Sequence, residues 1–255
     1  MIRLLSCSIV IMMLLAGCHL NSATENTVKK ECVIVIHGLG KSAFSMRKIA
    51  RALNEEGYTV WNGSYPSTRE PIETLADNYI AAGLQHCNHH HAKRIHFVTH
   101  SMGAILFRDY QQRHPVKNIG RVVMLAPPNH GSEIVDRLGH WPLYQRLLGP
   151  AGSSLTTGDS DLPHRLGATS ADVGIIAARL SIEPWFSILL PGPDDGKVSI
   201  ASTQLDGMND FVTAPTTHGL IVHHRSSIQQ TQRFLRTGHF SQHHTVGANV
   251  FPSQD

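Results

Sequence analysis

The chain is poor in aromatic and charged residues and contains only four cysteines. Of its 255 residues, 6% are aromatic and 16% are charged, and the formal net charge is only +3. No basic run with interleaved aromatic residues occurs, which argues against nucleic acid as a partner. No internal repeat is apparent, so the length is that of one globular domain with a leader.

A hydrophobic run of the roughly 20 residues that a membrane-spanning helix needs is also missing at the N-terminus. The mostly apolar run at residues 4–15 follows Arg3 and has only about a dozen residues, which is typical of the hydrophobic part of a secretory signal. The signal predicted at residues 1–17 ends in Leu-Ala-Gly before Cys18. This ending resembles the bacterial lipoprotein box, which implies that Cys18 is lipidated. An ordinary signal peptide followed by a coincidental cysteine is the alternative.

The polar residues 18–30 are predicted to tether a lipid anchor to the folded domain. His19, and not an aspartate, follows Cys18, so the resemblance implies the outer membrane, facing the periplasm, if the cell is Gram-negative. Residues 239–255 show little apolar patterning and are predicted to form a flexible tail. The expected location is therefore the cell envelope, and the expected contact with the membrane is an N-terminal lipid anchor.

Apolar strands that alternate with amphipathic helices predict an α/β domain at residues 31–238. The strand at residues 32–36 lacks polar alternation, which is typical of a parallel strand covered on both faces. We expect a doubly wound, mostly parallel sheet of about six strands. The predicted strands are 32–36, 58–61, 94–99, 120–126, 173–178 and 210–214, and the main helices are 44–56, 72–86, 102–113 and 225–236.

A candidate nucleophile lies between the strand at residues 94–99 and the helix that follows. Residues 99–103 read THSMG, with Ser101 at the centre. A serine in so tight a turn has a strained backbone and needs small residues two positions away. Gly103 meets this demand, whereas Thr99 replaces the glycine usual at its position. A serine in an ordinary loop is the alternative.

A second motif, HGLG at residues 37–40, ends the first predicted strand. Its glycines permit a sharp turn that points the backbone N–H of Leu39 into a cleft. Together with the N–H of Met102, it would form an oxyanion hole with two donors. A third motif, PPNHGS at residues 127–132, follows the fourth strand and places His130 where it could line the pocket.

These three motifs, in this order and at this spacing, resemble the α/β-hydrolase family, in particular its small bacterial lipases and esterases. The family has a compact sheet and the order serine, acid, histidine along the chain. Asp195 stands in a stretch that resembles the family's Asp-Gly-x-Val acid loop, and Asp194 is its nearest rival. His218 follows the last predicted strand, where a parallel sheet carries its active groups. The resemblance therefore implies a catalytic triad of Ser101, Asp195 and His218.

The other histidines are assigned lesser roles. His37 and His100 are expected to contribute to packing, with the ring of His100 pointing away from the Ser101 hydroxyl. Residues 86–91 include four histidines, but three consecutive ones cannot all face one ion from a regular element. They also precede a strand, at the end of the sheet opposite Ser101. We predict no required metal and no cofactor.

An insertion at about residues 133–172 is predicted to form a short lid. Its apolar residues, including Trp141 and Tyr144, could cover an acyl chain, so both are candidate pocket residues. The alternative is that they pack against the edge of the sheet.

Cys32 and Cys87 remain once Cys7 and Cys18 are assigned to the leader and the anchor. In the strand order of the family, the strands next to these two cysteines are neighbours, and both cysteines fall at the amino ends of the strands. A disulfide fits an oxidising envelope. Two buried free thiols are the alternative.

The sequence thus predicts a serine hydrolase that cleaves carboxylic esters, with a small acyl ester or a lipid as substrate. Thioester or amide cleavage would use the same groups. A catalytically silent binding or assembly factor of the same fold is the second hypothesis, and it predicts that a member of the triad is missing. The pattern says nothing of oligomeric state.

Overall fold

The computed structural model describes residues 30–241, and a six-stranded sheet lies at its centre. All neighbouring strands are parallel, in the order β2-β1-β3-β4-β5-β6. The predicted α/β fold is confirmed, and each predicted strand is found to within two residues at either end. The strands are β1 (Glu31–Ile36), β2 (Thr59–Trp61), β3 (Arg94–His100), β4 (Ile119–Leu125), β5 (Asp172–Ala178) and β6 (Asp210–Ala214).

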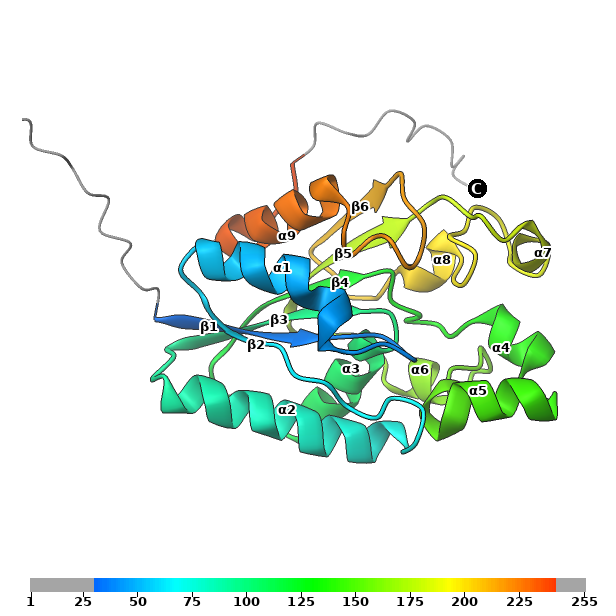
Figure 1. Ribbon diagram of the computed structural model, residues 1–255, viewed down its shortest axis with the longest axis horizontal. Helices are drawn as coiled ribbons and strands as arrows, with labels where there is room; N and C mark the ends of the chain where they lie inside the picture. Colours follow the sequence, from blue (N-terminus) through cyan, green and yellow to red (C-terminus); the bar gives the residue numbers. More distant parts are fainter. Residues whose placement is uncertain (1–29, 242–255) are drawn as a thin grey trace, which may run out of the picture.

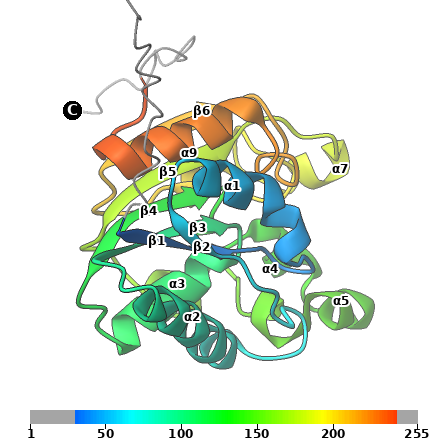
Figure 2. The same ribbon diagram turned by 60° about the vertical axis from the view of Figure 1, so that its left-hand side comes forward.

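Helices cover both faces of this sheet. Helices α1 (Ala43–Glu55) and α9 (Arg225–Thr237) pack on one face, and α2 (Ile72–His89) and α3 (Gly103–Arg113) pack on the other (Figures 1 and 2). Alternate residues of β1 enter two separate cores, with Val33 and Val35 on the α1 and α9 side. Because both faces are buried, the strand has no need of polar alternation.

Five further helices lie among the loops that leave the carboxyl ends of the strands (Figure 1). The predicted insertion contains the first three of them. None of the helices among residues 30–241 is long and apolar enough to cross a membrane. These five helices are α4 (Glu133–Leu138), α5 (Pro142–Ser153), α6 (Leu162–Arg165), α7 (Pro184–Ser187) and α8 (Ile200–Thr203).

The order of the strands reverses between β1 and β3. From β1 the chain moves outward to β2, then returns to β3 and continues through β4, β5 and β6 on the other side. Loops that leave β1 and β3 at their carboxyl ends therefore diverge, and such a switch point is where open α/β sheets bind ligands.

A disulfide joins Cys32 at the start of β1 to Cys87 near the end of α2. Both cysteines are fully buried, and their Cα atoms are 5.6 Å apart. The bond lies at the amino edge of the sheet, opposite the switch point. It closes a loop across a sequence separation of 55 residues.

The predicted signal at residues 1–17, with Cys18 and nearly all of the tether at 18–30, lies outside the described residues, as does most of the tail at 239–255. The boundary predicted at residue 238 is too early. Phe240 is only 3% exposed, its ring packs on Phe234, and its N–H donates to the Asp210 carboxylate at 2.7 Å. The folded domain therefore extends at least to Ser241.

Candidate active site

Ser101 lies at the apex of the turn between β3 and α3 and has a left-handed backbone. Its φ is 53°, a region that residues other than glycine rarely adopt. Its N–H donates to the Leu125 carbonyl at 2.9 Å, which fixes the turn against β4. A Cβ on Gly103 would lie 2.7 Å from the Ile36 carbonyl oxygen, so only glycine allows α3 to approach β1 this closely. The tight turn forms although Thr99 replaces the usual glycine.

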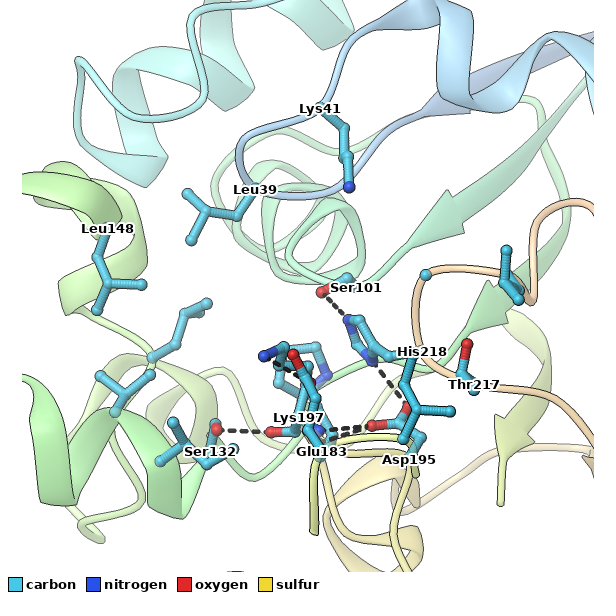
Figure 3. A pocket seen from close by; sticks show the side chains of 18 of the residues that line it. Leu39, Lys41, Ser101, Ser132, Leu148, Glu183, Asp195, Lys197, Thr217 and His218 are labelled. Carbon is cyan, nitrogen blue, oxygen red and sulfur yellow. Dashed lines mark hydrogen bonds and ion pairs between the residues drawn. The ribbon is translucent and has the colours of Figure 1, made fainter. Parts of the chain in front are cut away.

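Three side chains from separate loops form one hydrogen-bonded chain at this turn (Figure 3). The Ser101 hydroxyl lies 2.9 Å from Nε2 of His218, and Nδ1 of the same ring lies 2.8 Å from a carboxylate oxygen of Asp195. An ionised carboxylate only accepts hydrogen bonds, so Asp195 selects the tautomer with the proton on Nδ1. Nε2 is then free to accept the serine proton.

The Asp195 carboxylate is 2% exposed and held in place by backbone groups. Its second oxygen accepts the N–H groups of Lys197 and Val198 at 3.0 and 2.9 Å. Asp194, the rival candidate, instead accepts the Ser187 hydroxyl and the Gly196 N–H. Of the two neighbouring carboxylates, only Asp195 reaches His218.

The loop after β1 and the turn after β3 each bring one backbone donor toward the serine. Among the described residues, neither the N–H of Leu39 nor that of Met102 has a hydrogen-bond acceptor. The next N–H, that of Gly40, donates to the Ser67 hydroxyl at 2.9 Å, which fixes the far side of the turn. A Cβ on Gly38 would lie 3.1 Å from Cβ of Ser101, so the loop passes directly beside the serine.

His37 anchors the same loop from within the core. Its ring is fully buried and stacks on Tyr65, with 3.9 Å between the ring centroids. The Tyr65 N–H donates to Nε2 at 3.2 Å, so the Nδ1 proton is left to donate to the Gly38 carbonyl at 2.9 Å. Burial lowers the pKa of His37 and keeps the ring neutral.

His100 packs beside His218 without replacing it. Nε2 of His100 donates to the backbone carbonyl of His218 at 3.0 Å, and the two rings lie 5.2 Å apart. Burial lowers the pKa of His100 to about 3, and the neighbouring His218 contributes. A neutral ring can hold the His218 backbone without repelling a positive charge on the His218 imidazole.

Ser101 opens into a cavity of about 560 Å³, a volume typical of small-molecule sites. One wall comes from the insertion, through Ile134 and Val135 of α4 and Tyr144 and Leu148 of α5. The remaining lining residues are Leu39, Lys41, Pro128, Ser132, Leu155, Ile182, Glu183, Asp195, Lys197, Val198, Thr217, His218, Gly219 and Leu220.

Of the three residues predicted to line the pocket, Tyr144 does so and the other two do not. The His130 N–H donates to the Ser202 carbonyl, and its ring packs against His164, away from the cavity. Trp141 precedes α5 and is 57% exposed. Both residues lie on loops near the site, but neither lines the cavity.

Helix α5 combines the two alternatives left open for the insertion. Leu148 and Gly152 face inward, where a Cβ on Gly152 would lie 2.7 Å from a methyl group of Leu39. Leu143 and Leu147, on the other side of the helix, are 73% and 63% exposed. The helix therefore packs on the loop after β1 and leaves a second apolar face uncovered.

Three charged residues at the pocket are not singled out by any sequence motif. Lys197 forms an ion pair with Glu183 at 2.8 Å and lies over the ring of Phe186. Lys41 extends into the open space above Ser101 (Figure 3). All three stand on loops after β1 or β5, so their place at the carboxyl edge is the only signal in the sequence.

Among residues 30–241, no three His, Cys, Asp or Glu side chains are grouped so that they could hold a metal ion. In the histidine cluster, His86, His89 and His90 pack ring against ring at the end of α2. That no metal is required stays a prediction.

The chain belongs to the α/β hydrolase family, whose sequence profile matches residues 33–247. A comparison with curated proteins finds no match.

Solved structures with the same fold include three hydrolases. The mature Bacillus licheniformis lipase BlEst2 is 18% identical, with a TM-score of 0.62 over 81% of this chain and 91% of that one. Phospholipase PlaB from Legionella pneumophila is 17% identical, with a TM-score of 0.59 over 74% of this chain and 53% of that one. The Pyrococcus furiosus esterase PF2001 is 19% identical, with a TM-score of 0.54 over 82% and 81%. At these identities the likeness concerns the fold.

Proposed function

We propose that the protein is a serine esterase that hydrolyses carboxylic esters through an acyl-enzyme. The observation that carries this proposal is the hydrogen-bonded chain from Ser101 through His218 to Asp195, at a left-handed turn that opens into a pocket. Neighbours of the same fold that are named as lipase, phospholipase and esterase support it.

In the first half of the reaction, the Ser101 hydroxyl attacks the ester carbonyl while His218 accepts its proton through Nε2. The imidazolium that forms is stabilised by the Asp195 carboxylate. The negative charge on the former carbonyl oxygen is received by the free N–H groups of Leu39 and Met102. Each such donor contributes roughly 3–4 kcal/mol to the transition state.

His218 then returns the proton to the ester oxygen as the C–O bond breaks, which releases the alcohol and leaves the acyl-enzyme, and water takes the place of the alcohol. In the second half, His218 removes a proton from the water as the water attacks the acyl carbon. It returns this proton to the Ser101 oxygen as the acyl–oxygen bond breaks, which releases the acid and restores the Ser101 hydroxyl. The aliphatic side chains of α4 and α5 in the pocket wall favour an acyl chain or lipid as the substrate.

We place the enzyme at the bacterial cell envelope, anchored by a lipid on Cys18. The support is the N-terminal sequence, with its short apolar run and the Leu-Ala-Gly-Cys ending. The Cys32–Cys87 disulfide fits an oxidising compartment.

The test is the hydrolysis of p-nitrophenyl butyrate by the purified full-length chain. The parent should be active, and Ser101→Ala should reduce kcat/KM by about 10⁴-fold or more while the circular dichroism spectrum stays the same. A Ser101→Ala variant as fast as the parent would contradict the proposal. A folded parent that is inert toward ester, thioester and amide substrates alike would favour the silent binding factor.

A further inference from the structure

The large hydrophobic side chains that residues 30–241 leave exposed lie at the carboxyl edge of the sheet, around the pocket. Three of them are almost entirely in solvent, with Ile188 at 84%, Ile182 at 75% and Leu143 at 73% exposure. Apolar patches of this kind mark interaction surfaces. We call this set the apolar rim, and it comprises Phe44, Trp141, Leu143, Leu147, Leu180, Ile182, Trp185, Ile188 and Leu220.

The apolar rim surrounds the entrance to the site. Ile182 and Leu220 line the pocket itself. Helices α5 and α7 carry much of the rest and project from the carboxyl edge on opposite sides of the sheet in both views (Figures 1 and 2). Whatever covers the rim therefore also faces the opening above Ser101.

Exposed cations accompany the rim, and two of the nearby carboxylates are already engaged. Asp136 accepts from Thr157, and Glu183 pairs with Lys197. Phe44 lies under the Arg47 guanidinium at 3.7 Å. Within the described part of the chain, the exposed cations near the rim that form no ion pair include Lys41, Arg47, Lys48, Arg137 and Arg146.

We propose that the apolar rim docks onto the surface of an anionic lipid bilayer, with the pocket open toward the lipid. Side chains from several separate segments would enter the boundary between headgroups and acyl chains, and the unpaired cations would meet anionic headgroups. A second copy of the chain would instead bring cations against cations, which disfavours it as the occupant. The proposal goes beyond ester hydrolysis, because docking does not require Ser101 to react.

The protein carries its own reporters for this contact. It has three tryptophans, of which Trp141 and Trp185 belong to the rim, while Trp61 is half-buried in β2. Residues 1–29 contain no tryptophan, so a chain held at a membrane by its N-terminus alone would show no quenching of tryptophan fluorescence. The full chain with Ser101→Ala is mixed with phosphatidylcholine–phosphatidylglycerol vesicles whose acyl chains are brominated.

We expect the bromine atoms to quench the tryptophan fluorescence, and Trp141→Phe/Trp185→Phe to lose most of that quenching. Co-sedimentation with the vesicles without quenching would overturn the proposal, because the rim would then face away from the lipid. A blue shift of the tryptophan emission that grows with protein concentration in the absence of vesicles would overturn the proposal, because a second copy of the chain would then cover the rim.

A matched pair of charge reversals tests the orientation. Arg47→Glu/Lys48→Glu changes the rim side, and Lys93→Glu/Lys117→Glu makes the same change in net charge before β3 and β4, at the amino edge. The lipid concentration at half-maximal quenching should rise at least about tenfold for the first pair and less than about twofold for the second. Equal rises in this lipid concentration for the two pairs would show that only net charge matters, and would overturn the proposed orientation. Loss of ester hydrolysis with docking intact would remove the proposed function and leave this inference standing.

Discussion

At the amino edge of the sheet several charged side chains and two cysteines are paired, whereas at the carboxyl edge several polar groups have no partner. Glu31 pairs with Arg94, Asp172 pairs with Arg121, and the disulfide ties β1 to α2. The carboxyl edge contains the left-handed Ser101, the free N–H groups of Leu39 and Met102, and the apolar rim. A firmly bonded edge can stabilise a fold whose other edge is strained.

The comparison predicts that substitutions in the proposed triad, at the carboxyl edge, change the reaction, and that substitutions of the paired groups at the amino edge change stability. A substitution of either kind that changed activity and stability together would weaken this comparison.

The largest effect is expected at the carboxyl edge, from His218→Ala. Because this removes the group that accepts the serine proton, kcat/KM for p-nitrophenyl butyrate should fall by about 10⁴- to 10⁶-fold. The melting temperature should change by no more than about 2 °C. His223→Ala is the matched control, since His223 lies near the same loop but outside the triad, and it should stay within about threefold of the parent. An active His218→Ala variant would show that the base is another residue.

The double substitution Cys32→Ala/Cys87→Ala, at the amino edge, should lower stability and leave activity unchanged. Opening a loop with a sequence separation of 55 should lower the free energy of unfolding by about 4 kcal/mol, as measured by urea denaturation. Wherever the variant is folded, its kcat/KM should lie within about twofold of the parent. A selective loss of activity would mean that the two edges are coupled.

A buried histidine at the carboxyl edge should make stability depend on pH. The pKa of His100 is about 3 in the fold, against 6.5 in the unfolded chain. As the pH falls below 6.5, the unfolded chain therefore takes up a proton that the folded one does not, and stability is lost. Between pH 7 and pH 5 the parent should lose about 2 kcal/mol more than His100→Gln, which keeps a donor for the His218 carbonyl. If urea denaturation at the two pH values shows that the parent and His100→Gln lose the same free energy of unfolding, the prediction is wrong.

The smallest effect is expected from the ion pair between β4 and β5. Arg121 bonds the Asp172 carboxylate and the Leu235 carbonyl while partly buried, so Arg121→Ala should cost about 1 kcal/mol without changing kcat/KM. Arg51→Ala, which breaks the exposed pair with Glu55, should fall within the error of the same denaturation experiment. If the two substitutions lower the free energy of unfolding equally, the Arg121–Asp172 pair stabilises the fold no more than an exposed pair does.

The strands and the three members of the triad could be predicted from the sequence because each depends on local pattern or chain order. Uninterrupted Val and Ile residues predict buried parallel strands, and a serine between a strand and a helix predicts the turn at Ser101. The acid and the base then follow from the loops at the carboxyl ends of later strands. Asp195 and His218 needed only this topological rule and the family's order.

The direction of a loop side chain could not be predicted in the same way. His130 follows β4 at the correct edge, but the bond from its N–H to Ser202 turns it toward His164. Trp141 suits a lid by its chemistry, yet the packed face of α5 begins after it. Phe240 follows a helix as an isolated apolar residue, and only the space beside Phe234 shows that it belongs to the core. These outcomes depend on contacts between distant segments.

The most direct test of the account is covalent labelling by a fluorophosphonate, followed by peptide mapping. The reagent should modify Ser101 in the parent and in His223→Ala. His218 activates the Ser101 hydroxyl, and the N–H groups of Leu39 and Met102 bind the negatively charged oxygen that forms on the reagent. His218→Ala should be labelled at least about 100-fold more slowly. A parent that remains unlabelled, or is labelled at another serine, would contradict the central claim.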